Sequence, residues 1–226
     1  MQLIVPFRQR ETDLAVFIPY MQSFLKKQDI NFELTVVEQT EGKLFNRGKL
    51  LNIGFDLIAE SEKENSYFCF HDVDLLPEDH CNYTPPGQPA HLITELIYPS
   101  GNTSEISQHI NGGVILFKPD DFIKINGFSN NYWGWGAEDD DLAKRLRFYG
   151  IKLARRTGTY LDIETKKSDQ FMDADRKRAL NPQYSANKNR VWNTNYDYQK
   201  DGLNTLNYKL TKTQHHATHK HYVVEL

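Results

Sequence analysis

Short apolar runs alternate with amphipathic stretches through the first half of the chain. Residues 3–7 and 67–70 are continuous apolar runs, which predict strands buried on both faces. Residues 32–37 predict another strand, while residues 12–28 and the segment from Arg47 onward repeat apolar side chains at helical spacing. This alternation predicts an α/β fold with a mixed, mostly parallel sheet flanked by helices.

The second half is less regular. Its apolar positions predict strands at 114–117, 151–154 and 222–226, and helices at 119–125 and from residue 138 to Gly150. Residues 84–107 are rich in Pro, Gly and polar side chains, which predicts a loop, and residues 155–190 are weakly patterned. Pro19 predicts a kink or break in the first helix.

An acidic and aromatic segment stands out at residues 130–141. It combines three aromatic residues and two glycines with four consecutive acids, and the acids open the predicted helix. Acids there could simply stabilise the helix N-terminus, but this leaves the Trp133-Gly134-Trp135-Gly136 run unexplained. Trp faces stack on sugar rings and carboxylates accept their hydroxyl protons, so the segment predicts a saccharide site.

Two further motifs predict a site for a metal ion and a phosphate. Asp72 and Asp74 leave a buried strand, and paired carboxylates of this kind suit a divalent cation, although they could also form a polar turn. Arg47 and Lys49 stand near the start of a helix, where backbone N–H groups favour phosphate, although spacing alone is compatible with an ordinary amphipathic helix.

The composition of the chain argues against some classes of function. A net charge of -3 and scattered basic residues argue against nucleic-acid binding, and no apolar run is long enough for an integral membrane segment. We expect Cys69 and Cys81 to be reduced thiols in a cytoplasmic protein, which could lie peripherally on the inner membrane face. We expect the histidines near the C-terminus to be solvated rather than metal-bound: His215, His216, His219 and His221.

The segment from Trp133 to Asp141 resembles the Trp-Gly-Trp-Gly-x-Glu-Asp-Asp-Asp motif of the β-1,4-galactosyltransferase family. Matching motifs in family order extend the resemblance from Pro6 to about Tyr208. It implies a GT-A-like single domain over residues 1–226 and an inverting, metal-dependent transfer from a UDP-sugar. Residues 1–110 would mainly bind UDP and metal, and residues 111–226 would mainly bind acceptor, with a flexible loop at about 155–190.

The resemblance also implies a role for individual residues. Asp139 would be the catalytic base and Asp74 the direct ligand of Mn²⁺ or Mg²⁺. The acceptor would contact Trp135, Gly136, Glu138 and Asp140. The nucleotide-sugar, UDP-galactose or UDP-N-acetylgalactosamine, would contact Pro6, Phe7, Arg8, Arg10, Phe45, Arg47, Asp72, Val73, Ile110 and Gly113.

The chain departs from the family pattern in two places. The family's second metal ligand is a His, but no His lies between residues 110 and 214, and a loose alignment puts Asp162 and Glu164 there. Tyr184 and Ser185 do not match the family's pocket for an N-acetyl group, so N-acetylglucosamine is not implied as acceptor.

The donor sugar depends on Ile110, two places before the Gly112-Gly113 pair. Galactose-transferring relatives have Tyr there, and relatives that transfer N-acetylgalactosamine have Ile or Leu. We therefore expect N-acetylgalactosamine transfer at least as good as galactose transfer. The alternative is that Ile110 is simply a core residue.

Two other functions remain open. One is a carbohydrate-binding module in which Trp133 and Trp135 form the platform, and the other is a metal-dependent hydrolase that uses the same acids. The chain begins with Met and an apolar run directly after it, so we expect an intact bacterial-type enzyme without a membrane anchor. Its product would be a surface polysaccharide or lipooligosaccharide.

Overall fold

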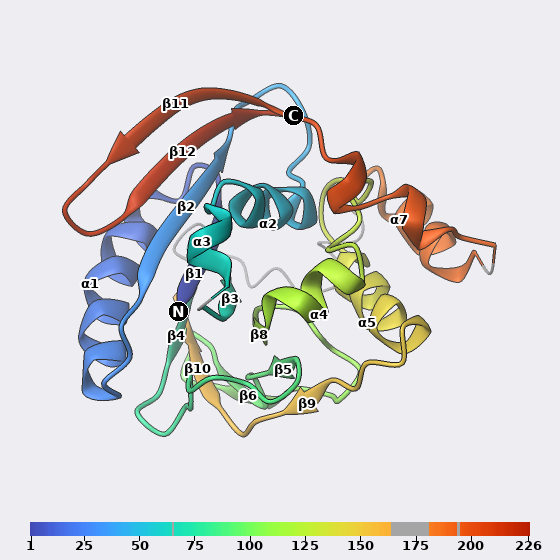
Figure 1. Ribbon diagram of the computed structural model, residues 1–226. Helices are drawn as coiled ribbons and strands as arrows, with labels where there is room; N and C mark the ends of the chain where they lie inside the picture. Colours follow the sequence, from blue (N-terminus) through green and yellow to red (C-terminus); the bar gives the residue numbers. More distant parts are fainter. Residues whose placement is uncertain (65, 164–180, 194) are drawn as a thin grey trace.

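A computed structural model describes residues 1–64, 66–163, 181–193 and 195–226. A mixed sheet forms its centre (Figure 1), with the strand order β11-β12-β2-β1-β3-β8-β5-β9. Four of its neighbouring strand pairs are parallel and three are antiparallel, as the sequence predicts. Its strands are β1 (Gln2–Phe7), β2 (Glu33–Gln39), β3 (Phe68–His71), β5 (Ala90–His91), β8 (Val114–Phe117), β9 (Ala154–Arg155), β11 (Lys209–His215) and β12 (Lys220–Glu225).

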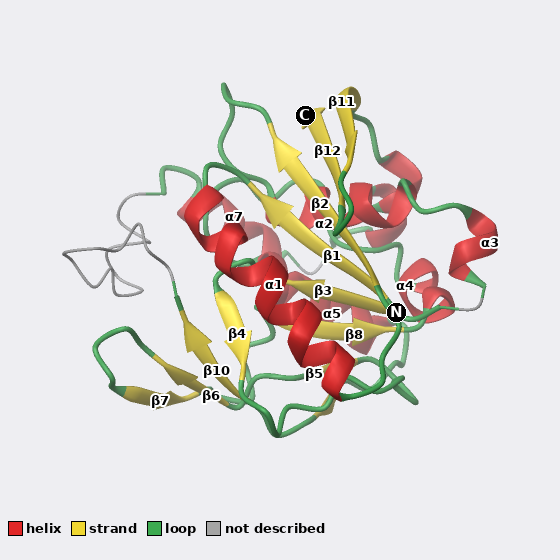
Figure 2. Ribbon diagram, turned by 90° about the vertical axis from the view of Figure 1, so that its left-hand side faces the viewer, coloured by secondary structure: helices red, strands yellow, loops and turns green. Residues whose placement is uncertain are grey.

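A smaller sheet with the order β4-β10-β6-β7 lies beside it (Figure 2). Its strands are β4 (Leu75–Pro77), β6 (Glu95–Ile97), β7 (Thr103–Glu105) and β10 (Thr159–Asp162). The predicted loop at 84–107 is therefore wrong in part, because it contains β5, β6 and β7. These strands are only two or three residues long, and β6 pairs with β10 far along the chain, so no local periodicity marks them.

The helices cover both faces of the main sheet. They are α1 (Glu11–Lys27), α2 (Arg47–Asp56), α3 (Glu60–Lys63), α4 (Pro119–Lys124), α5 (Glu138–Phe148) and α7 (Tyr184–Trp192), with 3₁₀ turns η2 (Tyr198–Lys200) and η3 (Leu203–Thr205). Helix α1 continues through Pro19, so the predicted break is wrong. Its apolar face packs on the sheet through Phe17 and Met21, which offsets the hydrogen bond that proline cannot make.

Two apolar clusters explain the continuous apolar runs. Leu3 and Val5 face the cluster under α1, whereas Ile4 between them faces the cluster under α2, α4 and α5. Successive side chains of a strand point to opposite faces, so a strand covered on both sides must be apolar throughout. Strands β1, β2 and β3 run parallel, which brings their carboxyl ends to one edge of the sheet.

Neither cysteine forms a disulfide, and both Cys69 and Cys81 are buried. Burial raises the pKa of both thiols, to about 11 for Cys81. Across the described residues, no helix has the length and apolar character needed to cross a membrane.

Candidate active site

A buried arginine joins three segments that are far apart in the sequence. Helix α2 begins at Arg47, and the Asn46 side chain caps it by accepting a hydrogen bond from the Lys49 backbone N–H at 3.0 Å. Arg47 Nε lies 2.6 Å from Asp72 Oδ1, and its Nη1 lies 3.8 Å from Glu138 Oε1. Burial alone would lower the pKa of Arg47, but the carboxylates of Asp72 and Glu138 outweigh it and raise that pKa.

The Asp-Val-Asp motif forms a turn, not an extension of the strand. Strand β3 ends at His71, and the Asp72 backbone N–H donates to the Gly113 carbonyl at 3.0 Å. The two acids therefore engage different partners: Asp72 pairs with Arg47, and Asp74 Oδ2 lies 3.1 Å from Arg10 Nη1. The strand does not persist through the motif, yet both acids line one cavity.

A buried histidine lies beneath this turn. The Nδ1 of His71 lies 2.8 Å from the Asp72 carbonyl and its Nε2 lies 2.8 Å from the Tyr83 hydroxyl. Burial lowers the pKa of His71 to about 3, so the ring is neutral and acts as a support. The polar contacts hold the turn on an otherwise apolar core.

The residues present fit a hard divalent cation. Strand β10 places Asp162 opposite Leu75, and the Ile163 backbone N–H donates to the Asp74 carbonyl at 2.8 Å. Asp162, the predicted second carboxylate, therefore lies on the strand beside the turn that carries Asp74. Carboxylate oxygens are ligands that suit Mn²⁺ and Mg²⁺. Glu164 and the rest of residues 164–180 lie outside the described residues. The predicted loop at 155–190 is wrong where it is described, because it contains β10 and most of α7.

A cavity of about 470 Å³ collects most of the predicted nucleotide contacts. The Arg8 guanidinium stands over the Phe45 ring, 5.3 Å from its centroid, at one wall. Phe7 does not line the cavity, because it is buried in the core with only 2% of its surface exposed. The predicted residues that line this cavity are Pro6, Arg8, Arg10, Phe45, Arg47, Asp72, Val73, Asp74, Trp135 and Glu138.

A second cavity, of about 500 Å³, adjoins the first and shares Arg47, Asp72, Trp135 and Glu138 with it. It contains five further residues of the predicted set: Ile110, Gly113, Gly136, Asp139 and Asp140. Asp162 lines neither cavity. The two cavities form one cleft, and Glu138, the first acid of α5, lines both of them.

The four acids that open α5 lie in different environments. Burial, together with the Asp139 charge, raises the pKa of Glu138 to about 7, and burial with the Asp140 charge raises that of Asp139. Arg47 opposes both shifts. Asp140 pairs with Lys188 at 2.7 Å, whereas Asp141 turns into the core.

Asp141 is structural. It accepts hydrogen bonds from Arg145 at 2.6 Å and from the Tyr132 hydroxyl at 3.2 Å, and Arg145 also donates to the Asp201 carbonyl at 2.7 Å. All these groups are buried, so the network ties α5 to the segment near the C-terminal hairpin. The last acid of the motif therefore has a structural role in the fold.

The Gly112-Gly113 pair allows the backbone to lie against Asp139. A Cβ at Gly112 would lie 3.2 Å from Asp139 Oδ2, and a Cβ at Gly113, whose φ is +88°, would lie only 2.3 Å from Ile93 Cδ1. The Gly112 carbonyl accepts a hydrogen bond from His91 Nε2 at 2.8 Å, and Arg155 holds His91 from its other nitrogen at 2.9 Å. Side chains larger than glycine would displace the wall of the cavity.

The structure adds several residues to the site whose contacts the sequence did not predict. Tyr184 stacks on Trp135 with ring centroids 6.1 Å apart, Lys188 pairs with Asp140, and Asn181 donates to the Trp135 carbonyl at 2.7 Å. His91 and Arg155 support Gly112. Each of these residues contacts a partner far away in the chain. Of the five, the sequence analysis noted only Tyr184, as a departure from the family pattern.

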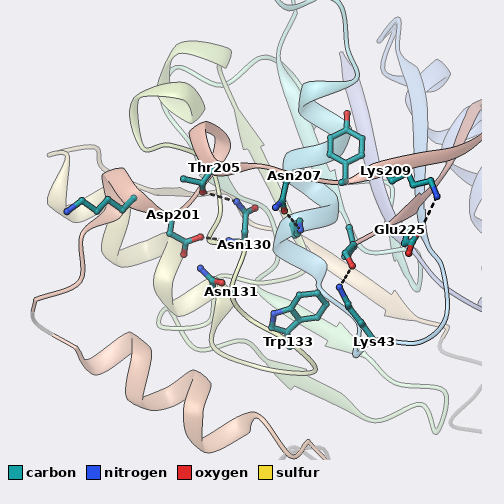
Figure 3. Close-up of a pocket in the computed structure, with 13 residues that line it drawn as sticks. Lys43, Asn130, Asn131, Trp133, Asp201, Thr205, Asn207, Lys209 and Glu225 are labelled. Atoms are coloured by element: carbon teal, nitrogen blue, oxygen red, sulfur yellow. Dashed lines mark hydrogen bonds and ion pairs between the residues drawn. The ribbon is translucent and has the colours of Figure 1, made fainter.

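Trp133 and Trp135 do not share a surface. Trp133 faces a separate hollow of about 790 Å³ on the other side of their loop, where Lys43 lies 5.9 Å from its ring (Figure 3). Asn130, Asp201 and Thr205 line the same hollow. Lys49, which the sequence places near a phosphate, also lines it, and its Nζ donates to Asn207 Oδ1 at 2.9 Å. The hollow contains none of the described residues that are predicted to be catalytic or to bind metal. A two-tryptophan sugar platform is therefore wrong.

The chain is similar to known glycosyltransferases. Residues 1–85 match the N-terminal region of glycosyl transferase group 7, and residues 99–168 match a model described as the N-terminal domain of galactosyltransferase. Human β-1,4-galactosyltransferase 4 is 36% identical over 228 residues, which cover 99% of this chain and 62% of that protein. The chain belongs to the β-1,4-galactosyltransferase family. Bovine β-1,4-galactosyltransferase 1 is 34% identical, and the match covers 54% of it, so the chain spans little more than half of these relatives.

Solved galactosyltransferase structures confirm the GT-A-like α/β fold. The catalytic domain of Drosophila β-1,4-galactosyltransferase 7, in complex with xylobiose, superposes with a TM-score of 0.77 at 28% identity and covers 100% of this chain and 93% of that one. A mutant of the same Drosophila enzyme, in complex with manganese, UDP-Gal and xylobiose, gives a TM-score of 0.81 at 29% identity with the same coverage.

Proposed function

We propose that the protein is an inverting glycosyltransferase that moves galactose or N-acetylgalactosamine from a UDP-sugar to a saccharide acceptor with the help of a divalent cation. The observation that carries the proposal is the position of Asp139. It is a partly buried carboxylate on the first turn of α5 that lines the second cavity, next to Glu138, which both cavities share. One cavity would take the nucleotide and the other the acceptor and the transferred sugar.

The first cavity suits a nucleoside diphosphate. Arg8 and Phe45 offer a cationic and aromatic wall for the nucleotide, and Arg47 and Arg10 supply positive charge beside Asp72 and Asp74. A divalent ion held by Asp74 and Asp162 would neutralise charge on the diphosphate leaving group. The Drosophila relative solved with manganese and UDP-Gal supports this arrangement.

Asp139 would accept the proton from the acceptor hydroxyl as that oxygen attacks the anomeric carbon. Burial and the Asp140 charge raise the pKa of Asp139, and a raised pKa makes its carboxylate a stronger base for this step. Glu138 and Asp140 would hold acceptor hydroxyls, and the stacked Trp135 and Tyr184 would contact a sugar ring. A single displacement with one base inverts the anomeric configuration and forms no covalent intermediate.

The alternatives explain less of the cleft. A carbohydrate-binding module leaves the Arg47–Asp72–Glu138 network unused, and its two tryptophans face different hollows. A two-metal hydrolase would favour histidine ligands, yet no described histidine lines the cavity that contains Asp72 and Asp74.

We also propose that residues 1–226 act as one domain, with residues 1–110 mainly binding nucleotide and metal and residues 111–226 mainly binding acceptor. The unpaired Cys69 and Cys81 support the predicted cytoplasmic location. A surface polysaccharide or lipooligosaccharide stays the predicted product.

The direct test measures melting temperature with UDP, with and without Mn²⁺, followed by transfer from UDP-sugars to a panel of simple saccharides. Stabilisation by UDP that requires Mn²⁺, together with a β-linked product from an α-linked donor, is expected for the transferase. Stabilisation by free sugars alone, with no response to UDP, would favour the carbohydrate-binding module.

Ile110→Tyr is expected to shift the donor preference toward UDP-galactose. Ile110 is 47% exposed and lines the second cavity with Gly113 and Asp139, so it is not a core residue. Its small apolar side chain would leave room for an acetyl methyl group, a contact of about 1 kcal/mol or slightly more, whereas a Tyr ring would fill that space.

The measurement is kcat/KM for UDP-galactose and UDP-N-acetylgalactosamine in both proteins. Ile123→Tyr is a matched control, because Ile123 is 51% exposed on α4 and lines neither cavity. Wild-type protein confined to UDP-galactose, or a donor ratio unmoved by Ile110→Tyr, would contradict the assignment.

A further inference from the structure

Three histidines meet at the hairpin formed by β11 and β12, at the outer edge of the main sheet (Figure 1). His215 pairs with Lys220, and the His216 backbone N–H donates to the His219 carbonyl at 2.9 Å, so His216 stands opposite His219 across the turn. His219 directly precedes β12 and His221 lies on it, two residues later, so their side chains face the same way. The register therefore puts His216, His219 and His221 on one face and His215 on the other.

The three rings approach closely enough to share one ion. One ligand nitrogen of each lies within 4.8 Å of those of the other two, and the His216 and His219 rings stack with centroids 4.4 Å apart. Tetrahedral coordination at about 2.0–2.1 Å requires nitrogens roughly 3.3 Å apart. Rotation of the exposed His216 side chain, which sits beside the turn, would close the difference.

Neighbouring groups prepare two of the rings for coordination. His221 Nε2 lies 2.8 Å from Glu38 Oε2 on β2, so a neutral ring donates there and keeps its Nδ1 lone pair available. His219 Nδ1 lies 2.9 Å from Thr218 Oγ1, and donation to that oxygen leaves Nε2 available. Metal-bound histidines commonly donate their second N–H to a carboxylate or another oxygen in this way.

The neighbouring basic side chain does not crowd the three rings. The Lys220 ammonium adds no repulsion on this face, because it points to the opposite face and pairs with Glu33 at 3.0 Å.

We propose that His216, His219 and His221 form a second metal site, which binds Zn²⁺ through three imidazole nitrogens while Glu38 orients His221. The site differs in chemistry from the carboxylates around Asp74, because imidazole suits Zn²⁺ and carboxylates suit Mn²⁺ or Mg²⁺. A bound ion would join the turn to strand β12 and, through Glu38, to β2. It would fasten the exposed edge strand β11 to the sheet.

The test is a Zn²⁺ titration of the full chain by calorimetry, with Mn²⁺ and UDP present in excess to occupy the other site. One Zn²⁺ per chain is expected in the wild type. His219→Ala should weaken Zn²⁺ binding at least 100-fold, Glu38→Gln should weaken it about 10–100-fold, and His215→Ala should leave it unchanged. Circular dichroism of each variant checks that the fold is retained.

Two results would overturn the site. Equal Zn²⁺ affinity in the wild type and in a His216→Ala/His219→Ala double variant would show that these rings are not ligands. An equal loss in His215→Ala would show that Zn²⁺ binds a histidine-rich tail without regard to its face. Glycosyl transfer by His219→Ala is expected at the wild-type rate, which keeps this test separate from that of the proposed function.

Discussion

Replacing Asp139 by Asn is expected to lower kcat for glycosyl transfer by about 10²–10⁴-fold, the usual loss for a general base. The amide keeps the size and much of the hydrogen bonding of the carboxylate but cannot accept a proton. Asp139 lies in the second cavity beside Gly112, where an acceptor hydroxyl would face the donor sugar. Binding of UDP with Mn²⁺ should be nearly unchanged, because Asp139 does not line the nucleotide cavity.

The pH dependence of kcat/KM distinguishes a catalytic base from a residue that only positions the acceptor. The wild-type kcat/KM should fall as pH drops through the raised pKa of Asp139, because the protonated form cannot accept a proton. Asp120→Asn is a matched control, because Asp120 also stands on the first turn of a helix but is exposed and outside both cavities. A loss in Asp139→Asn smaller than tenfold would exclude it as the base and direct attention to Glu138 or Asp140.

Asp74→Ala is expected to abolish Mn²⁺-supported transfer while the fold survives. Asp74 leaves the turn after β3 at the nucleotide cavity, and its side chain is 21% exposed and paired with Arg10. Without this carboxylate, Arg10 would remain, but the cation would lose its proposed direct ligand beside the diphosphate. The Mn²⁺-dependent part of UDP stabilisation should vanish in a thermal shift assay.

The control for Asp74→Ala is Asp79→Ala. Asp79 follows the same motif, but its side chain is 77% exposed and pairs with Lys27 on the surface. It should keep both transfer and the Mn²⁺ response. Activity like that of the wild type in Asp74→Ala would remove Asp74 from the metal site, and a lowered melting temperature without ligands would indicate a folding role instead.

Local patterns were sufficient for the long elements of the fold. Strands β1 and β3 are buried on both faces, so their sequences are apolar without interruption, and α5 begins at its acids and ends before Gly150. Local patterns did not predict β5, β6 and β7. Strands β5 and β6 pair with strands far along the chain, and the short β7 pairs with β6. The predicted break at Pro19 does not occur, because packing of the helix against the sheet outweighs one missing hydrogen bond.

The sequence by itself determined which residues are predicted to carry the chemistry, because each motif keeps its characteristic residues close together in the chain. Only the tertiary structure decided their partners. It separated Trp133 from Trp135, turned Asp141 into a buried pair with Arg145, and brought Tyr184 onto Trp135. Such contacts join segments tens of residues apart, and strand register and packing, which leave no local periodicity, fix them.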